Sequence, residues 1–96
     1  TEVEGVVSRH PAVAQCAVIG IPSEQWGESV HAIVTLRDGA SATSSEITAF
    51  CRERIAAYKC PRSVEIRTQP LPMTAAGKIL KAQLREPFWA NRSRRI

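Results

Sequence analysis

Residues 12–21 read Ala-Val-Ala-Gln-Cys-Ala-Val-Ile-Gly-Ile, an almost continuous apolar run that is rich in β-branched side chains. Such a run is typical of a strand that is buried on both faces, and Pro22-Ser23 marks its end. Upstream, residues 2–9 carry valines at the spacing of one helical face, and His10-Pro11 ends this helix because proline disfavours a helical predecessor. We therefore predict a short amphipathic helix followed by a buried strand.

A second strand is predicted downstream of this run. Residues 22–28 form a connecting loop, and from Val30 to Arg37 two sets of side chains alternate, as in a strand with two distinct faces. The turn residues Asp38-Gly39 follow directly. The two strands are thus neighbours in the sequence.

A helix is predicted to begin at Thr43. Thr43 and Glu46 have the spacing of a capping box, in which each side chain binds a backbone N–H of the other's residue. Apolar residues then recur at helical spacing as far as Tyr58, and Cys60-Pro61 supplies the stop. We therefore expect helical structure from the capping box to this stop.

The last third of the chain contributes one strand and one helix. Residues 63–67 alternate as a short strand, and residues 69–72 form a stiff extended connector. A loop of small residues at 73–77 precedes a helix over residues 78–86, which Pro87 closes. The whole order predicts a small α+β domain with a three-stranded sheet flanked by helices.

Length and composition exclude several classes of protein. The chain has 96 residues, of which 44% are hydrophobic and 23% charged, and this is the size of one domain. No apolar run approaches the roughly 18 to 20 residues of a membrane span, and no signal-peptide pattern is present. Because the chain opens without Met and in mid-pattern, we expect it to be part of a longer protein.

The cysteines and histidines do not form a metal or disulfide pattern. Cys16, Cys51 and Cys60 are an odd number without a C-x-x-C pair, which argues against a disulfide framework and favours an intracellular protein. His10 and His31 lie far from each other and from any cysteine pair. We therefore expect no structural metal.

Charge is distributed unevenly along the chain. Residues 1–57 contain four Lys/Arg and seven Asp/Glu, whereas residues 58–96 contain nine Lys/Arg and two Asp/Glu. A basic half of this size attracts polyanions, which include nucleic acid, an acidic membrane and a phosphorylated cofactor. Charge alone does not choose among them.

The loop at residues 74–80 is the first candidate site. Small residues and Gly77 let the backbone approach a ligand closely, and Lys78 places a flexible cation beside it. It is not a Walker P-loop, since Pro72 and Ile79 stand where that motif needs Gly and Ser or Thr. The alternative is a solvated turn with an exposed lysine.

Two further segments and the terminus are candidates. Trp26-Gly27 could offer a ligand a flat apolar wall, or the Trp could cover the sheet edge. Tyr58 and Arg62 offer a ring and a cation after a helix end, where a capping role is the alternative. Residues 88–95 mix aromatics with arginines but lack regular spacing, so we expect a frayed basic terminus. No Ser/His/Asp or Cys/His set indicates a self-contained hydrolase.

Taken together, these motifs resemble the C-terminal domain of adenylate-forming enzymes, and most closely that of acyl-CoA synthetases. The segments that carry the likeness are Glu2-Val-Glu4, His10-Pro-Ala-Val13, Ala17-Val-Ile-Gly-Ile-Pro22, Trp26-Gly-Glu28, Tyr58-Lys-Cys-Pro-Arg62, Leu71-Pro72 and Thr74-Ala-Ala-Gly-Lys-Ile-Leu80. Their order and spacing match to about Arg85. The likeness implies a lid domain at residues 1–86 and a basic tail at residues 87–96.

The resemblance implies an acid–thiol ligase that joins a carboxylic acid to ATP and then transfers the acyl group to CoA. In the family a large N-terminal domain of the same chain binds ATP, with its Mg²⁺, and the acid. The small C-terminal domain rotates between the two steps, so this chain would not be active alone. A cytoplasmic location is implied, with peripheral membrane contact left open, and no nucleic acid is expected.

The resemblance also assigns roles to individual residues. It places Lys78 at the family's catalytic lysine for adenylation, with Gly77 beside it on the nucleotide-binding loop. It places Trp26 and Gly27 along the pantetheine tunnel, and Tyr58 and Arg62 at the CoA nucleotide. Some relatives have a further cation where this chain has Cys60, which leaves the phosphate contact weaker or shared with Lys59.

Two alternatives stay open at this point. Within the family, the chain could be the lid of an enzyme that loads a carrier protein instead of CoA. Outside it, the basic half and the aromatic-arginine terminus could belong to a small module that binds nucleic acid or an acidic surface, with a steep dependence on salt.

Overall fold

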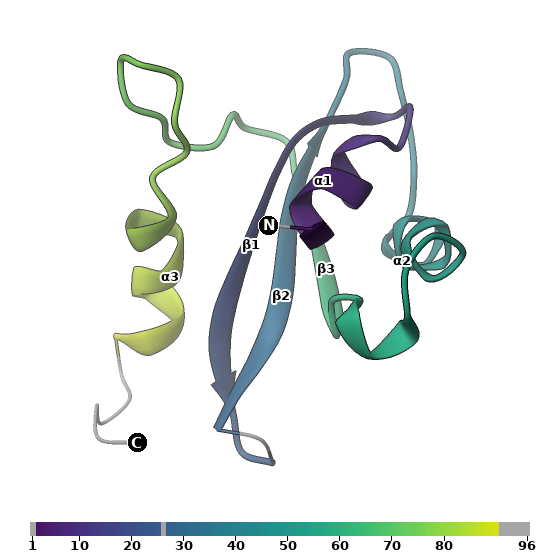
Figure 1. Cartoon of the computed structure of the whole chain (residues 1–96). Helices are drawn as coiled ribbons and strands as arrows, with labels where there is room; N and C mark the ends of the chain where they lie inside the picture. The colour runs from purple at the N-terminus through teal and green to yellow at the C-terminus, as the bar shows by residue number, and fades with distance from the viewer. Residues whose placement is uncertain (1, 26, 91–96) are drawn as a thin grey trace.

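The computed structural model describes residues 2–25 and 27–90, and it confirms the α+β class with a three-stranded sheet (Figure 1). The elements are helix α1 (Glu2–Ser8), strands β1 (Val13–Ser23) and β2 (Gly27–Leu36), helix α2 (Ser44–Arg52), the 3₁₀ turn η1 (Ala57–Lys59), strand β3 (Ser63–Arg67) and helix α3 (Lys81–Trp89). The sheet order is β1-β2-β3. β1 and β2 form an antiparallel hairpin, and β3 runs parallel to β2.

Helices cover both faces of the sheet. α1 and α2 lie on one face and α3 on the other, as Figure 1 shows. Between α1, α2 and the sheet lies a core cluster of Val6, Val7, Val13, Cys16, Val34, Ile47, Cys51 and Cys60. A smaller cluster beneath α3 contains Ala17, Ile19, Ile33, Leu71 and Leu84. The continuous apolar run of β1 is thereby explained, because successive residues face opposite clusters.

The strand β1 extends further than we predicted. It continues through Pro22 to Ser23, where Pro22 pairs with Glu28 of β2. A proline is tolerated there because β1 is an edge strand, in which one side of the backbone needs no hydrogen-bond partner in the sheet. The expected loop at residues 22–28 is therefore a tight hairpin, and Gly27 meets its geometry with φ +79°.

The capping box of α2 is confirmed. The Glu46 amide donates to the Thr43 hydroxyl at 3.1 Å, and the Thr43 amide donates to the Glu46 carboxylate at 2.8 Å. The helix ends at Arg52, however, and not near Cys60 as predicted. Ala56 is extended with ψ 141°, and a single 3₁₀ turn follows. This break directs Cys60 into the core. The helical spacing of apolar residues beyond Arg52 therefore predicts a longer helix than the structure has.

The last helix also differs from the prediction. It begins at Lys81 because an isolated bridge between Met73 and Ile79 keeps the preceding residues extended. It then passes through Pro87, which lies in the last turn and costs one backbone hydrogen bond. Phe88 packs against the cluster beneath α3, and the Trp89 indole N–H donates to the Gly20 carbonyl at 3.0 Å. The expected frayed terminus is thus wrong for these two aromatics, and residues 91–95 lie outside the described residues.

In the part of the chain described, no helix is long and apolar enough to cross a membrane.

Candidate functional site

Lys78 lies on a closed hairpin loop that its own backbone holds in shape. The Thr74 amide donates to the Lys78 carbonyl at 2.8 Å, and the Gly77 amide donates to the Thr74 carbonyl at 3.0 Å. The Lys78 amide donates in turn to the Thr74 hydroxyl at 3.1 Å. Gly77 has φ +90°, a conformation that residues with a Cβ rarely adopt. The sequence therefore specifies a defined turn at the base of the lysine.

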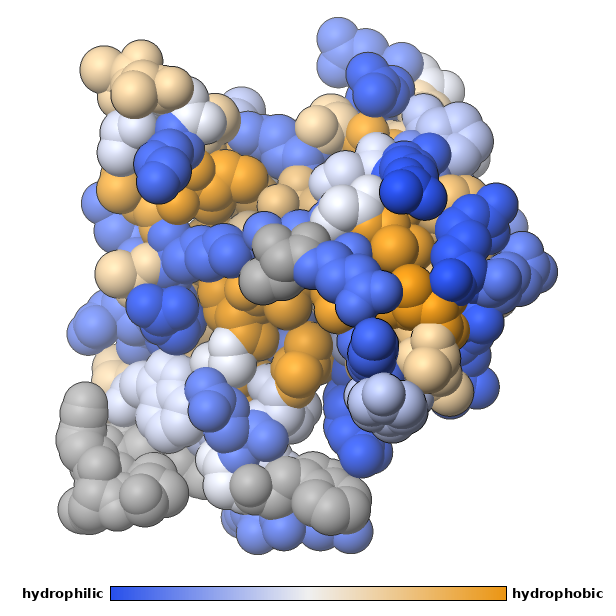
Figure 2. All heavy atoms as spheres, viewed as in Figure 1, coloured by the Kyte–Doolittle hydropathy of each residue, from blue (hydrophilic) through white to orange (hydrophobic). Residues whose placement is uncertain are grey.

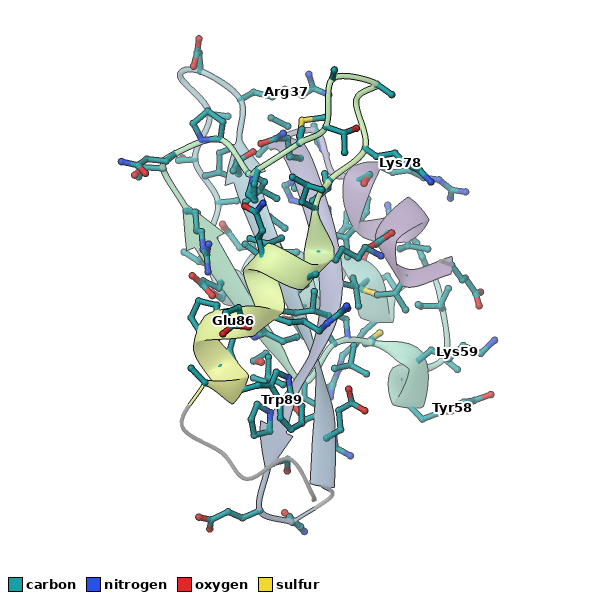
Figure 3. The ribbon with its side chains drawn as sticks, turned by 90° about the vertical axis from the view of Figure 1, so that its left-hand side faces the viewer. Arg37, Tyr58, Lys59, Lys78, Glu86 and Trp89 are labelled. Carbon is teal, nitrogen blue, oxygen red and sulfur yellow. The ribbon has the colours of Figure 1, made fainter. Side chains whose placement is uncertain are left out.

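The Lys78 side chain projects from this loop into solvent, as Figure 3 shows. Within residues 2–25 and 27–90, no carboxylate forms an ion pair with its ammonium group. The chain continues directly into α3, whose Leu84 is 2% exposed. An unpaired cation is thus carried on a shaped loop that is anchored to the core.

A second anchor joins the start of α3 to α1. The Lys81 ammonium pairs with the Glu4 carboxylate at 2.5 Å, and the same carboxylate oxygen accepts the Val18 amide at 2.8 Å. Partial burial alone would raise the pKa of Glu4, but the hydrogen bonds from Lys81 and Val18 lower the pKa below its ordinary value of 4.5. The Glu4 carboxylate therefore links α1, β1 and the start of α3. Its partner Lys81 lies three residues after Lys78 in the sequence.

We predict that this anchor makes stability sensitive to acid. Because the folded-state pKa of Glu4 is lowered, its stabilisation is present above pH 4.5 and is lost as the pH falls through the folded-state value. In urea unfolding between pH 7 and pH 3, Glu4→Gln should flatten this loss of stability relative to the native chain. Glu86→Gln, which removes an exposed carboxylate of α3, is the control and should leave the slope as it is. A native slope in Glu4→Gln would contradict the role of the anchor.

The segment from Tyr58 to Arg62 forms a second site. Tyr58, the middle residue of η1, is 85% exposed, whereas Cys60 and Pro61, which follow η1, are buried. The Arg62 amide donates to the Val30 carbonyl at 2.8 Å, which fixes this segment to β2. Lys59 pairs with Glu2 at 3.2 Å, and its ammonium lies 6.0 Å from the centre of the Tyr58 ring. Tyr58 and Lys59 project from the same side of the domain as Lys78 in Figure 3.

A pocket of about 340 Å³ opens at this segment. Tyr58 and Arg62 both line it, so the structure brings these two predicted residues together. Arg52, at the end of α2, lines the same pocket, and sequence analysis did not select it. The sequence signal that could have identified Arg52 is its place in the last turn of the helix that precedes Tyr58. No acidic residue is among those that line the pocket.

Gly27 lies at the tip of the β1–β2 hairpin, far from Lys78. Figures 1 and 3 show the hairpin tip and the Lys78 loop at opposite ends of the domain. Trp26 lies outside the described residues. A groove of about 310 Å³ follows the hairpin, with Val18, Gly20 and Val30 among its lining residues. Figure 2 shows apolar side chains at the surface over β1 and β2. Gly27 lines neither this groove nor the pocket beside Tyr58, so Gly27, the Lys78 loop and the pocket of Tyr58 and Arg62 are three separate places in the described structure.

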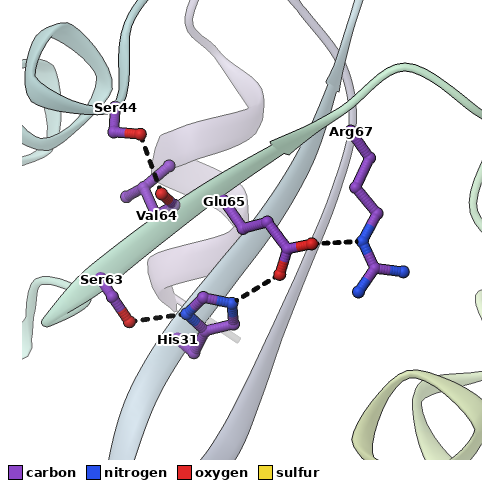
Figure 4. A network of polar contacts seen from close by, with 6 residues as sticks. All are labelled: His31, Ser44, Ser63, Val64, Glu65 and Arg67. Atoms are coloured by element: carbon purple, nitrogen blue, oxygen red, sulfur yellow. Dashed lines mark hydrogen bonds and ion pairs between the residues drawn. The ribbon is translucent and has the colours of Figure 1, made fainter. Parts of the chain in front are cut away.

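A polar network that the sequence did not reveal lies between β2 and β3 (Figure 4). His31 is 7% exposed, with Nδ1 2.6 Å from the Ser63 hydroxyl and Nε2 3.0 Å from the Glu65 carboxylate. Arg67 donates to the other oxygen of Glu65 at 2.6 Å. Burial would raise the pKa of Glu65, but Arg67 and His31 lower it. The network satisfies a buried histidine and contacts neither candidate site, so we assign it a structural role.

The cysteines offer no nucleophile. All three are free and buried. Burial raises the pKa of Cys16 to about 12, and burial followed by the neighbouring Cys60 raises that of Cys51 to about 12. At neutral pH both therefore remain thiols, which are weak nucleophiles. Among the residues that the structure describes, no group of three or more His, Cys, Asp or Glu could hold a metal ion.

Comparison with known proteins yields consistent matches. The model of the AMP-binding enzyme C-terminal domain matches residues 2–78. A feruloyl-CoA synthase of Amycolatopsis is 46% identical, over 91% of this chain and 18% of that enzyme. A fatty acid–[acyl-carrier-protein] ligase of Streptomyces coeruleorubidus is 36% identical, over 99% of this chain and 18% of that enzyme. The structure of a Mycobacterium tuberculosis fatty acyl CoA synthetase superposes with a TM-score of 0.83 at 39% identity, over 93% of this chain and 17% of that one. The chain thus spans less than a fifth of the length of these relatives.

Proposed function

Because the chain belongs to the AMP-binding enzyme C-terminal domain family, we propose that it serves as the mobile lid of an ATP-dependent acyl-CoA synthetase. In this proposal an N-terminal adenylation domain of the same polypeptide binds ATP and a carboxylic acid, and the lid completes the site for each half-reaction. The relatives that are CoA ligases, and the small share of their length that this chain spans, support the proposal.

The observation that carries the proposal is the separation of two cationic sites on one small domain. Lys78 stands on its own loop, whereas Arg62 lines a pocket beside Tyr58 whose lining does not include Lys78. A single site would serve one reaction step. Two separate sites suit a domain that turns between adenylation and thioester formation.

In the first half-reaction, a carboxylate oxygen attacks the α-phosphorus of ATP, the acyl-adenylate forms and pyrophosphate leaves. Two anions must approach each other, so the Lys78 ammonium would offset the charge that develops between them. The shaped loop limits the positions that the lysine can take, which lowers the entropy cost of placing it. In this proposal Mg²⁺ would accompany ATP on the N-terminal domain.

In the second half-reaction, the thiol of CoA attacks the acyl-adenylate, the thioester forms and AMP leaves. The hairpin groove with Val18 and Val30 offers an apolar path for the thin pantetheine arm. Arg62 adjoins this groove through its backbone bond to Val30. We propose that Tyr58 stacks on the base of CoA and that Arg62 pairs with a phosphate.

A second candidate acceptor is a carrier protein with its own pantetheine arm. The ligase of Streptomyces coeruleorubidus, which is named for such an acceptor, supports this alternative. The apolar groove would accept the same arm in either case. The charged pocket distinguishes the two, since it suits the nucleotide that only CoA carries.

The test is a pair of half-reaction assays on the polypeptide that carries this domain together with its N-terminal domain. We expect pyrophosphate release from ATP with an aliphatic or aromatic carboxylic acid, and a thioester on addition of CoA. Absence of pyrophosphate release with a panel of such acids would contradict the synthetase proposal. Transfer to a pantetheine-bearing carrier protein without transfer to CoA would favour the alternative acceptor.

A further inference from the structure

Two arginines line the pocket beside Tyr58. Arg52 and Arg62 are the charged residues that line it, and the others are Thr48, Ala57, Tyr58, Cys60 and Pro61. The lining therefore carries two positive charges and no negative one. A pocket of this kind attracts a dianion more strongly than a monoanion.

Arg52 reaches this pocket from the last turn of α2. It is exposed, and no described residue forms a hydrogen bond or ion pair with its guanidinium. Its neighbour Arg54 differs, because it lies 3.6 Å above the Phe50 ring and contacts Glu53 at 3.3 Å. Arg52 is thus a cation of α2 that remains available to a ligand.

The residues between Tyr58 and Arg62 do not supply a second cation to this pocket. Lys59 does not line the pocket, and Glu2 pairs with its ammonium at 3.2 Å. Cys60 is 6% exposed, and its Sγ lies 3.7 Å from the Ala56 carbonyl, to which it donates. Lys59 is therefore a weaker candidate than Arg52 for the shared phosphate contact, because Arg52 lines the pocket and Lys59 does not.

We propose that Arg52 acts with Arg62 to bind the 3′-phosphate of CoA, so that the pair distinguishes CoA from its 3′-dephospho form. This inference rests on the proposed function. A phosphate monoester carries close to two negative charges at neutral pH. Guanidinium groups match its oxygens with paired N–H donors, which a single ammonium does not. Tyr58, at the rim, would stack on the adenine.

The experiment measures KM for CoA and for 3′-dephospho-CoA in the polypeptide with both domains. Arg52→Gln should raise KM for CoA about tenfold, which corresponds to about 1.4 kcal/mol, and change KM for 3′-dephospho-CoA less than twofold. The matched control is Arg54→Gln, which removes a cation two residues away that does not line the pocket. It should leave both constants unchanged. Both variants exchange exposed side chains, so thermal midpoints close to the native value verify that they are folded.

Three results would overturn the inference. The first is an unchanged KM for CoA in Arg52→Gln. The second is an equal rise for CoA and 3′-dephospho-CoA, since this would mean that Arg52 does not contact the 3′-phosphate. The third is loss of discrimination in Lys59→Gln alone, which would make Lys59 the second cation. Each of these results requires that the native protein forms the thioester with CoA. If the native protein forms no thioester at all, the proposed function itself has failed.

Discussion

Replacement of Lys78 by alanine is expected to slow acyl-adenylate formation by a factor of about 10² to 10³, the effect of removing one preorganised group that stabilises transition-state charge. Lys78 has no ion-pair partner among the described residues, so the substitution leaves no buried charge behind. Its loop is closed by backbone bonds and by Thr74, which the substitution retains. The loss should therefore come from chemistry and not from unfolding. Pyrophosphate release from acid and ATP measures it.

The second half-reaction separates a catalytic lysine from a structural one. Thioester formation from supplied acyl-adenylate and CoA should change less than about threefold in Lys78→Ala, because Lys78 does not line the pocket proposed for CoA. Arg85→Ala, which removes an exposed cation of α3, is the control for loss of positive charge. If both half-reactions survive intact, Lys78 is an ordinary surface lysine. If the rates of both half-reactions fall equally, Lys78 acts by maintaining the shape of the domain and not by catalysing adenylation.

The largest expected effect on stability comes from Ile33→Ala. Ile33 is fully buried in the central strand and packs with Leu71 and Leu84 beneath α3. Removing its methyl and methylene groups leaves a cavity, and such substitutions cost about 2 to 5 kcal/mol. A domain of this size has a total stability of about 5 to 15 kcal/mol, so the variant loses much of its reserve. The free energy of unfolding in urea measures the change.

The matched control lies on the same strand. Val30 is 40% exposed, and Val30→Ala should cost less than about 1 kcal/mol. Equal losses in the two variants would contradict the packing described for the cluster beneath α3. A loss in Ile33→Ala below about 1 kcal/mol would mean that this cluster closes around the smaller side chain.

The sequence predicted the elements whose signals are local. The apolar run at β1, the capping box at Thr43 and Glu46, and the strand Ser63–Arg67 all lie where they were expected. Each depends on neighbours a few residues away, such as the paired amides of the capping box. The family resemblance was recognised for the same reason, since short motifs in a fixed order can be read along one chain.

Helix ends were less predictable, because contacts distant in sequence decide them. The spacing of apolar residues continues past Arg52, but the chain leaves the helix so that Cys60 can reach the core. Pro87 marks a helix end in isolation, yet α3 passes through it to place Phe88 and Trp89 against the sheet. Packing of two aromatic side chains outweighs one lost backbone hydrogen bond.

By itself, then, the sequence determined the class of fold, the family and the two segments that carry Lys78 and Tyr58. Only the tertiary structure decided that Lys78 lies apart from the pocket beside Tyr58 and that Arg52 joins Arg62 in lining this pocket. The same holds for the carboxylate of Glu4, which meets Lys81 from 77 positions away in the chain. Charges so distant in sequence act together only after folding brings them close, because their interaction falls with distance and is screened by salt beyond about 10 Å.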